Sequence, residues 1–380
     1  MHILVVNGPN LNLLGTREPS LYGTDTLADL AVQWQERAAL YGASVETFQS
    51  NHEGAIVDAI QDAAGRYDGL VINAGALTHY SYSLRDAVAA TGLVSVEVHI
   101  SNIYEREEWR HFSVLSDVCD LTIVGRGTVG YLDAINHLIA TSAAPALTVN
   151  YSDHENGVLD LRVPDGPGPH PVALLIHGGF WREIWKRDLM DPMAVALVTH
   201  GWATANMEYT RGASSYSSAI PDVNRAVDWI TENATEQQLD TGRIVAIGHS
   251  AGGYLALRLA HDTRALAAAL SLAAVTDLAS MASSRPDDDP VHAFLGSPRS
   301  KAPRLWEQAE LVGEPSAPID LLHGADDDDV APSQSSAYVN LHEQSARMTL
   351  IDDCDHMDLI DPHADSWSSL LAALAQVSAQ

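Results

Sequence analysis

The chain has 380 residues, more than a single hydrophobic core usually organises, so we expect two domains. Its 21 basic and 50 acidic residues give a formal charge of −29, which opposes binding to nucleic acid or anionic lipid. No apolar run is long enough to span a bilayer, and the first residues lack the features of a signal peptide. We therefore expect a protein that binds neither membrane nor nucleic acid. Because Cys119 and Cys354 are the only cysteines, we also expect a cytoplasmic location.

Residues 1–142 have the pattern of a parallel α/β domain. Short β-branched runs alternate with helical stretches, as they do when crossover helices join the strands of a parallel sheet. The predicted strands cover residues 3–6, 44–48, 69–73, 94–100 and 121–124. Five such units predict a flavodoxin-like sheet of five parallel strands.

The stretch TSAAPALTVN interrupts this pattern, and we assign residues 143–150 to a linker. Strands alternate with helices again in residues 151–380, which predicts a second, larger α/β domain. Its predicted strands cover residues 159–163, 172–177, 203–208, 243–250, 266–274 and 318–324. The two halves share no motif, which indicates two different sites and not a duplication.

Polar residues follow nearly every predicted strand of the first domain. NGPNLN comes after the first strand, QSNHEG after the second and NAGALTHYSYSLRDA after the third, while EVHISN contains the end of the fourth. In an open parallel sheet, ligands bind beyond the carboxyl ends of the strands. Folding alone does not require Asn, Arg, Tyr, His and Ser along one edge, so these blocks predict a binding site.

The same blocks resemble, in order and spacing over residues 1–142, the motifs of type II 3-dehydroquinate dehydratases. The resemblance implies dehydration of 3-dehydroquinate to 3-dehydroshikimate without a metal or an organic cofactor. It implies that Tyr22 is the base, with Arg17 beside it. It also implies that His99 is the general acid and that Asn10 holds a water against the enolate oxygen. The substrate-binding residues that it implies are Asn73, His79, Ile100, Ser101, Arg110 and, from a neighbouring subunit of a homo-oligomer (trimer or dodecamer), Asp86.

The charge of Arg17 is large enough to make Tyr22 a useful base. A tyrosine has an ordinary pKa near 10, so its phenolate must be stabilised by about 4 kcal/mol to act near neutral pH. A guanidinium about 4 Å away supplies about 4 kcal/mol at an effective dielectric constant of 20. This pair therefore accounts for the base without a metal ion.

The segment NIYEREEWR departs from the usual family pattern, NIHAREEFR. Tyr104 and Trp109 mark the departure, whereas Arg106 and Arg110 are retained. We expect this change to alter substrate affinity and not to abolish activity.

A nucleotide-binding flavodoxin-like domain is the alternative for this half. The run GRGTVG, residues 125–130, fits G-x-G-x-x-G after a strand, but it follows the last strand of the sheet. A tight turn before the last helix explains it better. The combination of Arg17, Tyr22 and His99 also argues against a nucleotide binder, and flavin absorbance in the purified protein would favour one.

The segment GHSAGG, residues 248–253, predicts a nucleophile in the second half. It follows the β-rich run RIVAI and precedes the helical run YLALRLAH, which is the context of a nucleophile elbow. Ser250 would then be the nucleophile. Upstream, HGGFW follows a strand, where backbone N–H groups face an oxyanion and His177 would fix the loop. The oxyanion-hole candidates are Gly178, Gly179, Phe180 and Ala251.

An acid and a histidine follow Ser250 in the order found in α/β-hydrolases. Four aspartates are adjacent at residues 326–329, and the spacing G-x-x-D-x-x-V from Gly324 selects Asp327. His356 lies in CDHMDLIDP near the end of the chain. Together these residues predict acyl transfer to water, in which Ser250 attacks, His356 relays the proton and Asp327 orients the imidazole.

Through HGGFW, GHSAG and the late histidine, this half resembles kynurenine formamidase-like and carboxylesterase-like α/β-hydrolases. The resemblance implies an α/β-hydrolase fold and a small carboxyl ester or formamide as substrate. We therefore expect a bifunctional enzyme that acts on small molecules. The alternative is an active dehydroquinase whose hydrolase-fold domain is a non-catalytic scaffold or binding domain.

Overall fold

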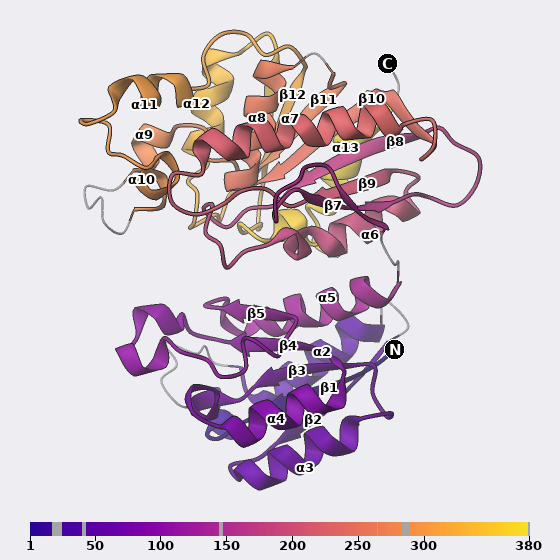
Figure 1. The fold of residues 1–380 in the computed structure, drawn as a ribbon, viewed down its shortest axis with the longest axis vertical. Helices are drawn as coiled ribbons and strands as arrows, with labels where there is room; N and C mark the ends of the chain where they lie inside the picture. The colour runs from indigo at the N-terminus through magenta and orange to yellow at the C-terminus, as the bar shows by residue number, and fades with distance from the viewer. Residues whose placement is uncertain (17–24, 40–42, 144–146, 264, 283–288, 379–380) are drawn as a thin grey trace. The chain divides into compact units, whose positions relative to one another are not determined.

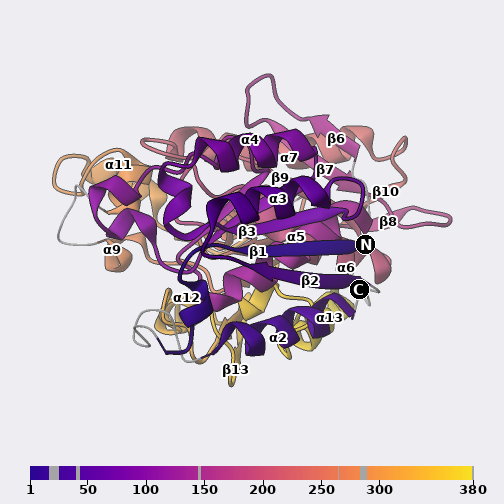
Figure 2. The same cartoon turned by 90° about the horizontal axis from the view of Figure 1, so that it is seen from below.

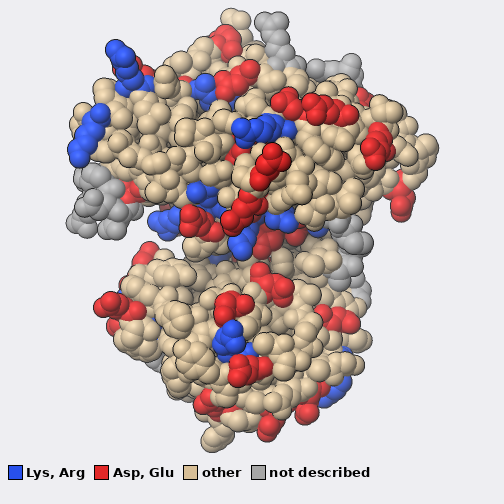
Figure 3. Space-filling view, in the orientation of Figure 1, with Lys and Arg blue, Asp and Glu red and all other residues tan. Residues whose placement is uncertain are grey.

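The computed structural model describes residues 1–16, 25–39, 43–143, 147–263, 265–282 and 289–378 (Figure 1). The chain forms two compact units, Met1–Ala143 and Ala144–Gln380. Within the described residues, no helix combines the length and apolarity needed to cross a membrane. On the visible faces, acidic side chains are spread over each unit and not gathered in one patch (Figure 3).

The first unit is a sheet of five parallel strands in the order β2-β1-β3-β4-β5, which confirms the flavodoxin-like prediction. The strands are β1 (His2–Asn7), β2 (Ser44–Gln49), β3 (Gly69–Asn73), β4 (Val94–His99) and β5 (Leu121–Val124). All five lie within a residue or two of their predicted positions. The helices are α2 (Leu27–Ala39), α3 (Glu53–Ala63), α4 (Tyr82–Thr91) and α5 (Gly130–Ala143).

Alternation along the strands places apolar side chains on both faces of this sheet. Ile3 and Val5 of β1 pack with α2 and α5, whereas Leu4 and Val6 pack with α3 and α4. Figure 2 shows α3 and α4 together on one face. A β-strand presents successive side chains to opposite faces, so a continuous apolar run is buried on both sides.

Short 3-10 helices follow the carboxyl ends of the central strands. They are η1 (Leu11–Leu13), η2 (Gly75–His79), η3 (Ile103–Glu105) and η4 (Glu108–Arg110). The run at residues 125–130 forms a turn and η5 (Gly127–Val129), which leads into α5 as expected. These segments, and not the strands themselves, carry most of the polar blocks.

The second unit is an eight-stranded sheet in the order β13-β12-β11-β10-β8-β9-β7-β6. The strands are β6 (Leu147–Asn150), β7 (Val158–Arg162), β8 (His170–Ile176), β9 (Ala203–Met207), β10 (Leu239–His249), β11 (Ala268–Leu272), β12 (Ile319–Gly324) and β13 (Ala346–Ile351). Strands β8 to β13 are parallel, and β6 and β7 are antiparallel to their neighbours.

Helices cover both faces of this larger sheet. On one face, α7 (Tyr216–Asn233) and α8 (Ala251–Asp262) bury Val223, Ile230 and Leu255. On the other face, α6 (Asp191–Thr199) and α13 (Trp367–Ser378) bury Leu197 and Leu374. The remaining helices are α9 (Leu278–Met281), α10 (Pro290–Leu295), α11 (Pro303–Ala309), α12 (Ser333–Leu341) and the 3-10 helices η6 (Arg187–Met190) and η8 (Asp358–Ile360).

Two strands of this sheet differ from the prediction. Residues 147–150, which we had placed in the linker, form β6, so the linker prediction was wrong there. Residues 346–351 form β13, which we had not predicted. Both strands lie at the edges of the sheet and are largely exposed, so their sequences lack the apolar pattern that marks a buried strand.

Candidate active sites

A cavity of about 160 Å³ lies at the carboxyl ends of the central strands in the first unit. Its walls come from the segments after β1, β3 and β4. The predicted site residues that line it are Asn10, Asn73, His79, His99, Ile100, Ser101 and Arg110. Arg106 also lines it, although our site prediction did not include this residue. Arg17 and Tyr22 lie outside the described residues.

Close backbone packing positions the loop after β1. A Cβ atom on Gly8 would overlap the backbone of Ala74, so glycine lets this loop pack against the loop after β3. Asn10 has a left-handed backbone with φ of 69°. Its N–H donates to Asn51 Oδ1 at 2.8 Å. These contacts hold the backbone of Asn10 at the edge of the cavity.

A buried network fixes the side chain of Asn73 at the end of β3. Asn73 Nδ2 donates to the hydroxyl oxygen of Tyr131 at 2.8 Å, and that hydroxyl donates to Asn7 Oδ1 at 2.6 Å. The N–H of Gly75 donates to Asn73 Oδ1 at 3.2 Å. Burial raises the pKa of Tyr131, so its hydroxyl stays protonated and keeps donating.

His99 ends β4 beside a buried carboxylate. Its Nε2 atom lies 3.0 Å from Oε1 of Glu97, which is fully buried. Thr78 and Ser113 also donate their hydroxyl groups to Glu97. Burial acts to raise the pKa of Glu97, but the hydrogen bonds from His99, Thr78 and Ser113 hold it below its usual value. Glu97 is therefore an ionised partner for the imidazole.

Arginine and aromatic side chains form another wall of the cavity. Arg106 Nη1 donates to Ser101 Oγ at 3.3 Å. The guanidinium of Arg110 lies 4.1 Å from the ring centre of Trp109, which meets His79 edge-on. Trp109, which departs from the family pattern, thus contacts two predicted substrate-binding residues.

In the second unit, Ser250 stands at a sharp turn between β10 and α8. Its φ of 54° and ψ of −117° are unusual for a residue other than glycine, as in a nucleophile elbow. A Cβ atom on Gly248 would overlap Gly252, and one on Gly252 would overlap the carbonyl oxygen of Ile176. The two glycines of the motif therefore let the turn pack against the end of β8.

Asp327 and His356 lie together beyond the ends of β12 and β13. His356 Nδ1 is 2.7 Å from Asp327 Oδ2, and Asp327 Oδ1 accepts hydrogen bonds from the N–H groups of Asp329 and Val330. The other three aspartates of the run are exposed. Burial acts to raise the pKa of Asp327, but hydrogen bonds from His323 and His356 hold it well below the usual 3.8.

The segment after β8 passes over the turn that carries Ser250. A Cβ atom on Gly178 would lie 3.0 Å from Cβ of Ser250. The next three residues all have positive φ values: Gly179 at 105°, Phe180 at 50° and Trp181 at 56°. This conformation keeps the chain close to Ser250, and Ala251 follows as the first residue of α8.

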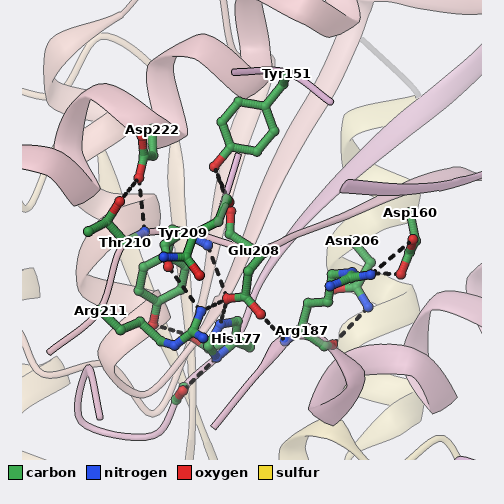
Figure 4. A network of polar contacts seen from close by, with 12 residues as sticks. Tyr151, Asp160, His177, Arg187, Asn206, Glu208, Tyr209, Thr210, Arg211 and Asp222 are labelled. Carbon is green, nitrogen blue, oxygen red and sulfur yellow. Dashed lines mark hydrogen bonds and ion pairs between the residues drawn. The ribbon is translucent and has the colours of Figure 1, made fainter. Parts of the chain in front are cut away.

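His177, which precedes Gly178, is fully buried (Figure 4). Its Nδ1 atom bonds to the carbonyl oxygen of Gly178 at 2.8 Å, and its Nε2 atom lies 2.9 Å from Glu208 Oε1. His177 therefore contacts the oxyanion-loop candidates through one ring nitrogen and a buried carboxylate through the other.

Among the side chains that the structure describes, no group of three or more His, Cys, Asp or Glu is placed to hold a metal ion.

Comparison with known proteins identifies the first unit. The Dehydroquinase class II family model matches residues 1–139. The chain is 55% identical over 136 residues to catabolic 3-dehydroquinase 1 of Aspergillus terreus, which covers 36% of this chain and 90% of the relative. It is 53% identical over 143 residues to 3-dehydroquinate dehydratase of Bacillus pumilus, which covers 38% of this chain and 97% of the relative. The chain belongs to the class II dehydroquinase family. We call residues 1–143 the dehydroquinase domain.

The second unit matches the BD-FAE family model over residues 159–342. A truncated carbohydrate esterase from gut microbiota is 17% identical with a TM-score of 0.55, covering 61% of this chain and 95% of that protein. Esterase B from Lactobacillus Rhamnosis is 18% identical with a TM-score of 0.54, covering 63% and 86%. These likenesses confirm the α/β-hydrolase fold, and we call this unit the hydrolase domain.

Three buried residues near these sites were not found from the sequence: Glu97 in the dehydroquinase domain, and His323 and Glu208 in the hydrolase domain. His323 Nε2 lies 3.3 Å from Asp327 Oδ2. The segment E-V-H could have predicted that Glu97 lies beside His99, because residues two apart on a strand share a face. His323 and Glu208 stand at the ends of apolar strands, where a single polar residue resembles a hydrogen-bonding cap of the strand.

Asp86 lies on α4, apart from the residues that line the cavity of its own domain. Its side chain is 78% exposed and lies 3.4 Å from Arg85 Nη1. This position agrees with a role at the surface of the dehydroquinase domain.

Proposed function

We propose that the chain is a bifunctional enzyme, a cofactor-free 3-dehydroquinate dehydratase joined to a serine hydrolase. The cavity of the dehydroquinase domain is the observation that carries the first activity. Polar side chains from the ends of three strands converge there, and His99 carries a buried carboxylate partner. The relatives named 3-dehydroquinase and 3-dehydroquinate dehydratase support the same substrate.

The dehydration proceeds through an enolate. The Tyr22 phenolate, stabilised by Arg17, removes a proton from the carbon next to the ketone. The water held by Asn10 bonds to the enolate oxygen that forms. The enolate then collapses and expels the hydroxyl group from the adjacent carbon, and His99 donates the proton that turns it into water. Glu97 holds His99 in the orientation for this transfer.

Substrate binding involves the polar wall of the cavity. We assign Asn73, His79 and Ser101 to the hydroxyl and carboxylate groups of the substrate. The backbone of Ile100 and the guanidinium of Arg110 complete the set. Arg106, which lines the cavity and bonds to Ser101, adds a second positive charge for the carboxylate.

The test of this assignment is Tyr22→Phe, compared with Tyr67→Phe. Tyr67 donates to Glu46 on the outer strand β2 and takes no part in the proposed site. We expect Tyr22→Phe to remove almost all formation of the conjugated enone and to leave ligand binding largely intact. Wild-type activity should survive chelator and borohydride, since an enolate needs neither a metal nor a Schiff base. Full turnover by Tyr22→Phe would refute the assignment.

The hydrolase acts through Ser250, Asp327 and His356. Ser250 attacks the acyl carbon, and His356 takes its proton and delivers it to the leaving group. The N–H groups of the oxyanion loop (Gly178, Gly179 and Phe180) and of Ala251 face the developing negative charge. Water then cleaves the acyl-enzyme. The bond from His356 to the ionised Asp327 is the observation that carries this reading.

The substrate class is a small carboxyl ester, with a formamide as the second candidate because of the HGGFW segment. The dehydratase suggests one ester in particular. Quinate occurs esterified to hydroxycinnamic acids, and its release and oxidation by a separate dehydrogenase give 3-dehydroquinate. Fusion would then raise the local concentration of both enzymes.

Comparing three substrates separates these possibilities. The kcat/KM of wild type and Ser250→Ala is measured on p-nitrophenyl acetate, a chlorogenate-type quinate ester and N-formylkynurenine. We expect Ser250-dependent cleavage of an ester. Preference for N-formylkynurenine would support the formamidase, and no Ser250-dependent cleavage of any of the three would support the non-catalytic scaffold. Quinate-ester cleavage at background only would remove the link between the two activities.

We also propose a cytoplasmic homo-oligomer built on the dehydroquinase domain, a trimer or a dodecamer. The exposed Asp86 then reaches the cavity of a neighbouring subunit. Cys119 and Cys354 are both free thiols, which agrees with a reducing compartment.

A further inference from the structure

Glu208 is a buried acidic residue that the proposed hydrolase mechanism does not use. It follows β9 directly and is 3% exposed. Strand β9 pairs with β8 in a register that places Ile176 beside Met207. The next residues of the chain, His177 and Glu208, are thereby brought together at the carboxyl edge of the sheet, where the segment that contacts Ser250 begins.

Both carboxylate oxygens of Glu208 have hydrogen-bond or ion-pair partners (Figure 4). Oε1 lies 2.9 Å from His177 Nε2 and accepts a hydrogen bond from the N–H of Tyr209 at 3.1 Å. Arg211, whose side chain is also buried, forms an ion pair with the same oxygen. Oε2 accepts a hydrogen bond from the N–H of Arg187 at 3.2 Å. Glu208 therefore links β8, η6 and the segment after β9.

Tyr209 also contacts His177, through a hydrogen bond and through its ring. The hydroxyl group of Tyr209 donates to the carbonyl oxygen of His177 at 3.0 Å, and the two rings stack with centres 4.5 Å apart. With Nε2 against Glu208, the remaining ring nitrogen, Nδ1, bonds to the carbonyl oxygen of Gly178. The orientation of the ring thus determines where that carbonyl points.

The direction of the Gly178 carbonyl group sets the direction of the Gly179 N–H group. The carbonyl group of Gly178 and the N–H group of Gly179 belong to one planar trans peptide, so they point in opposite directions. When His177 holds the carbonyl, the N–H of Gly179 points away from His177. Gly178 itself lies against Ser250, where a Cβ atom would be 3.0 Å from Cβ of the serine.

We propose that Glu208 is a positioning residue for the oxyanion hole of the hydrolase domain. Through His177 it fixes the Gly178–Gly179 peptide, so that the N–H of Gly179 faces the oxyanion formed at Ser250. This inference rests on the proposed serine hydrolase. The three consecutive positive φ values from Gly179 to Trp181 give it a physical reason, because such a conformation persists only where surrounding contacts hold it.

Glu208→Gln tests the proposal with little change in side-chain volume. Asp222→Asn is the matched control: Asp222 is also a buried carboxylate and accepts hydrogen bonds from Thr210 and His154, away from His177 (Figure 4). We expect Glu208→Gln to lower kcat on p-nitrophenyl acetate by about 10- to 100-fold with little change in KM, since the oxyanion exists only after attack. Asp222→Asn should keep its kcat.

A transition-state mimic gives an independent readout. A trifluoromethyl ketone forms an adduct with the serine that carries an oxyanion, so its affinity should fall in Glu208→Gln in proportion to kcat/KM. The double variant His177→Gln/Glu208→Gln completes a cycle. Because Glu208 acts through His177, its substitution should add little in the His177→Gln background.

The outcomes separate this inference from the proposed function. Hydrolysis that is unchanged in Ser250→Ala would refute the serine mechanism itself. If Ser250→Ala is inactive but Glu208→Gln keeps its kcat and its ketone affinity, the mechanism stands and the role of Glu208 is refuted. An equal loss of kcat in Asp222→Asn would show a general effect of removing a buried carboxylate, and fully additive losses in the double variant would also overturn the proposal.

Discussion

In both domains a buried carboxylate contacts the histidine to which we assign proton transfer. Glu97 Oε1 lies 3.0 Å from His99 Nε2, and Asp327 Oδ2 lies 2.7 Å from His356 Nδ1. The spacing of the hydrolase motif predicted Asp327, but no motif pointed to Glu97. Buried polar groups need partners, so a carboxylate in an otherwise apolar strand has to be paired with something. That requirement shows only that Glu97 has a partner, and the two-residue spacing within E-V-H is the signal that points to His99.

The role of Glu97 is tested by Glu97→Gln. The amide has a similar shape but lacks the charge that orients and stabilises the imidazolium of His99. We expect the kcat of dehydration to fall by about 10- to 100-fold, a large part of what a positioned general acid contributes. Glu46→Gln on β2 is the control, because Glu46 bonds to Tyr67 and not to a site residue. Wild-type kcat in Glu97→Gln would contradict the role.

The lowered pKa of Asp327 predicts how the stability of the hydrolase domain depends on pH. A carboxylate whose pKa is lower in the folded state stabilises the fold above its unfolded pKa, near 3.8, and this contribution is lost as the pH falls. We expect the Tm of the hydrolase domain to fall more steeply in wild type than in Asp327→Asn between about pH 5 and pH 3. The exposed neighbour gives the control Asp326→Asn, which should follow wild type. Parallel curves for all three proteins would refute the prediction.

At the scale of the elements, the apolar runs of the sequence predicted the five strands of the first sheet and the six central strands of the second. Most of these runs are buried on both faces, which is why their signal was strong. The edge strand β2 is largely exposed but was predicted from its β-branched residues, whereas the exposed edge strands β6 and β13 were missed. The sites followed a similar rule: residues within a motif, the buried Asp327 among them, were predicted, whereas the buried partners outside any motif, Glu97, His323 and Glu208, were not.

The turn that carries Ser250 is the element most sensitive to substitution. In Gly252→Ala, the new methyl group would overlap the backbone of Ile176, which has no rotamer through which to move away. We expect a loss of about 3 kcal/mol and a fall in Tm of about 10 °C for the hydrolase domain. In Gly242→Ala, the nearest atom to the new methyl is a side-chain oxygen of Asp240 at 3.2 Å, so its Tm should hardly change. Equal Tm values would contradict this account of the turn.

At the scale of the whole molecule, the proposed homo-oligomer predicts that two inactive variants restore each other's activity. If Asp86 completes a neighbour's cavity, a mixed oligomer of Tyr22→Phe and Asp86→Ala contains some cavities with both native residues. We expect each variant alone to be nearly inactive and the co-expressed mixture to recover up to about a quarter of wild-type dehydratase activity. No recovery of dehydratase activity in a mixed oligomer would refute the shared site. A protein that is monomeric by solution scattering and yet fully active would also refute it.

The central claim is that one chain carries two separate active sites, and a crossed assay of the full-length protein tests it most directly. Wild type, Tyr22→Phe and Ser250→Ala are each assayed for enone formation from 3-dehydroquinate and for p-nitrophenyl acetate cleavage. We predict that Tyr22→Phe loses dehydration and keeps hydrolysis, whereas Ser250→Ala loses hydrolysis and keeps dehydration. Loss of both activities in either variant, or retention of both, would contradict the claim.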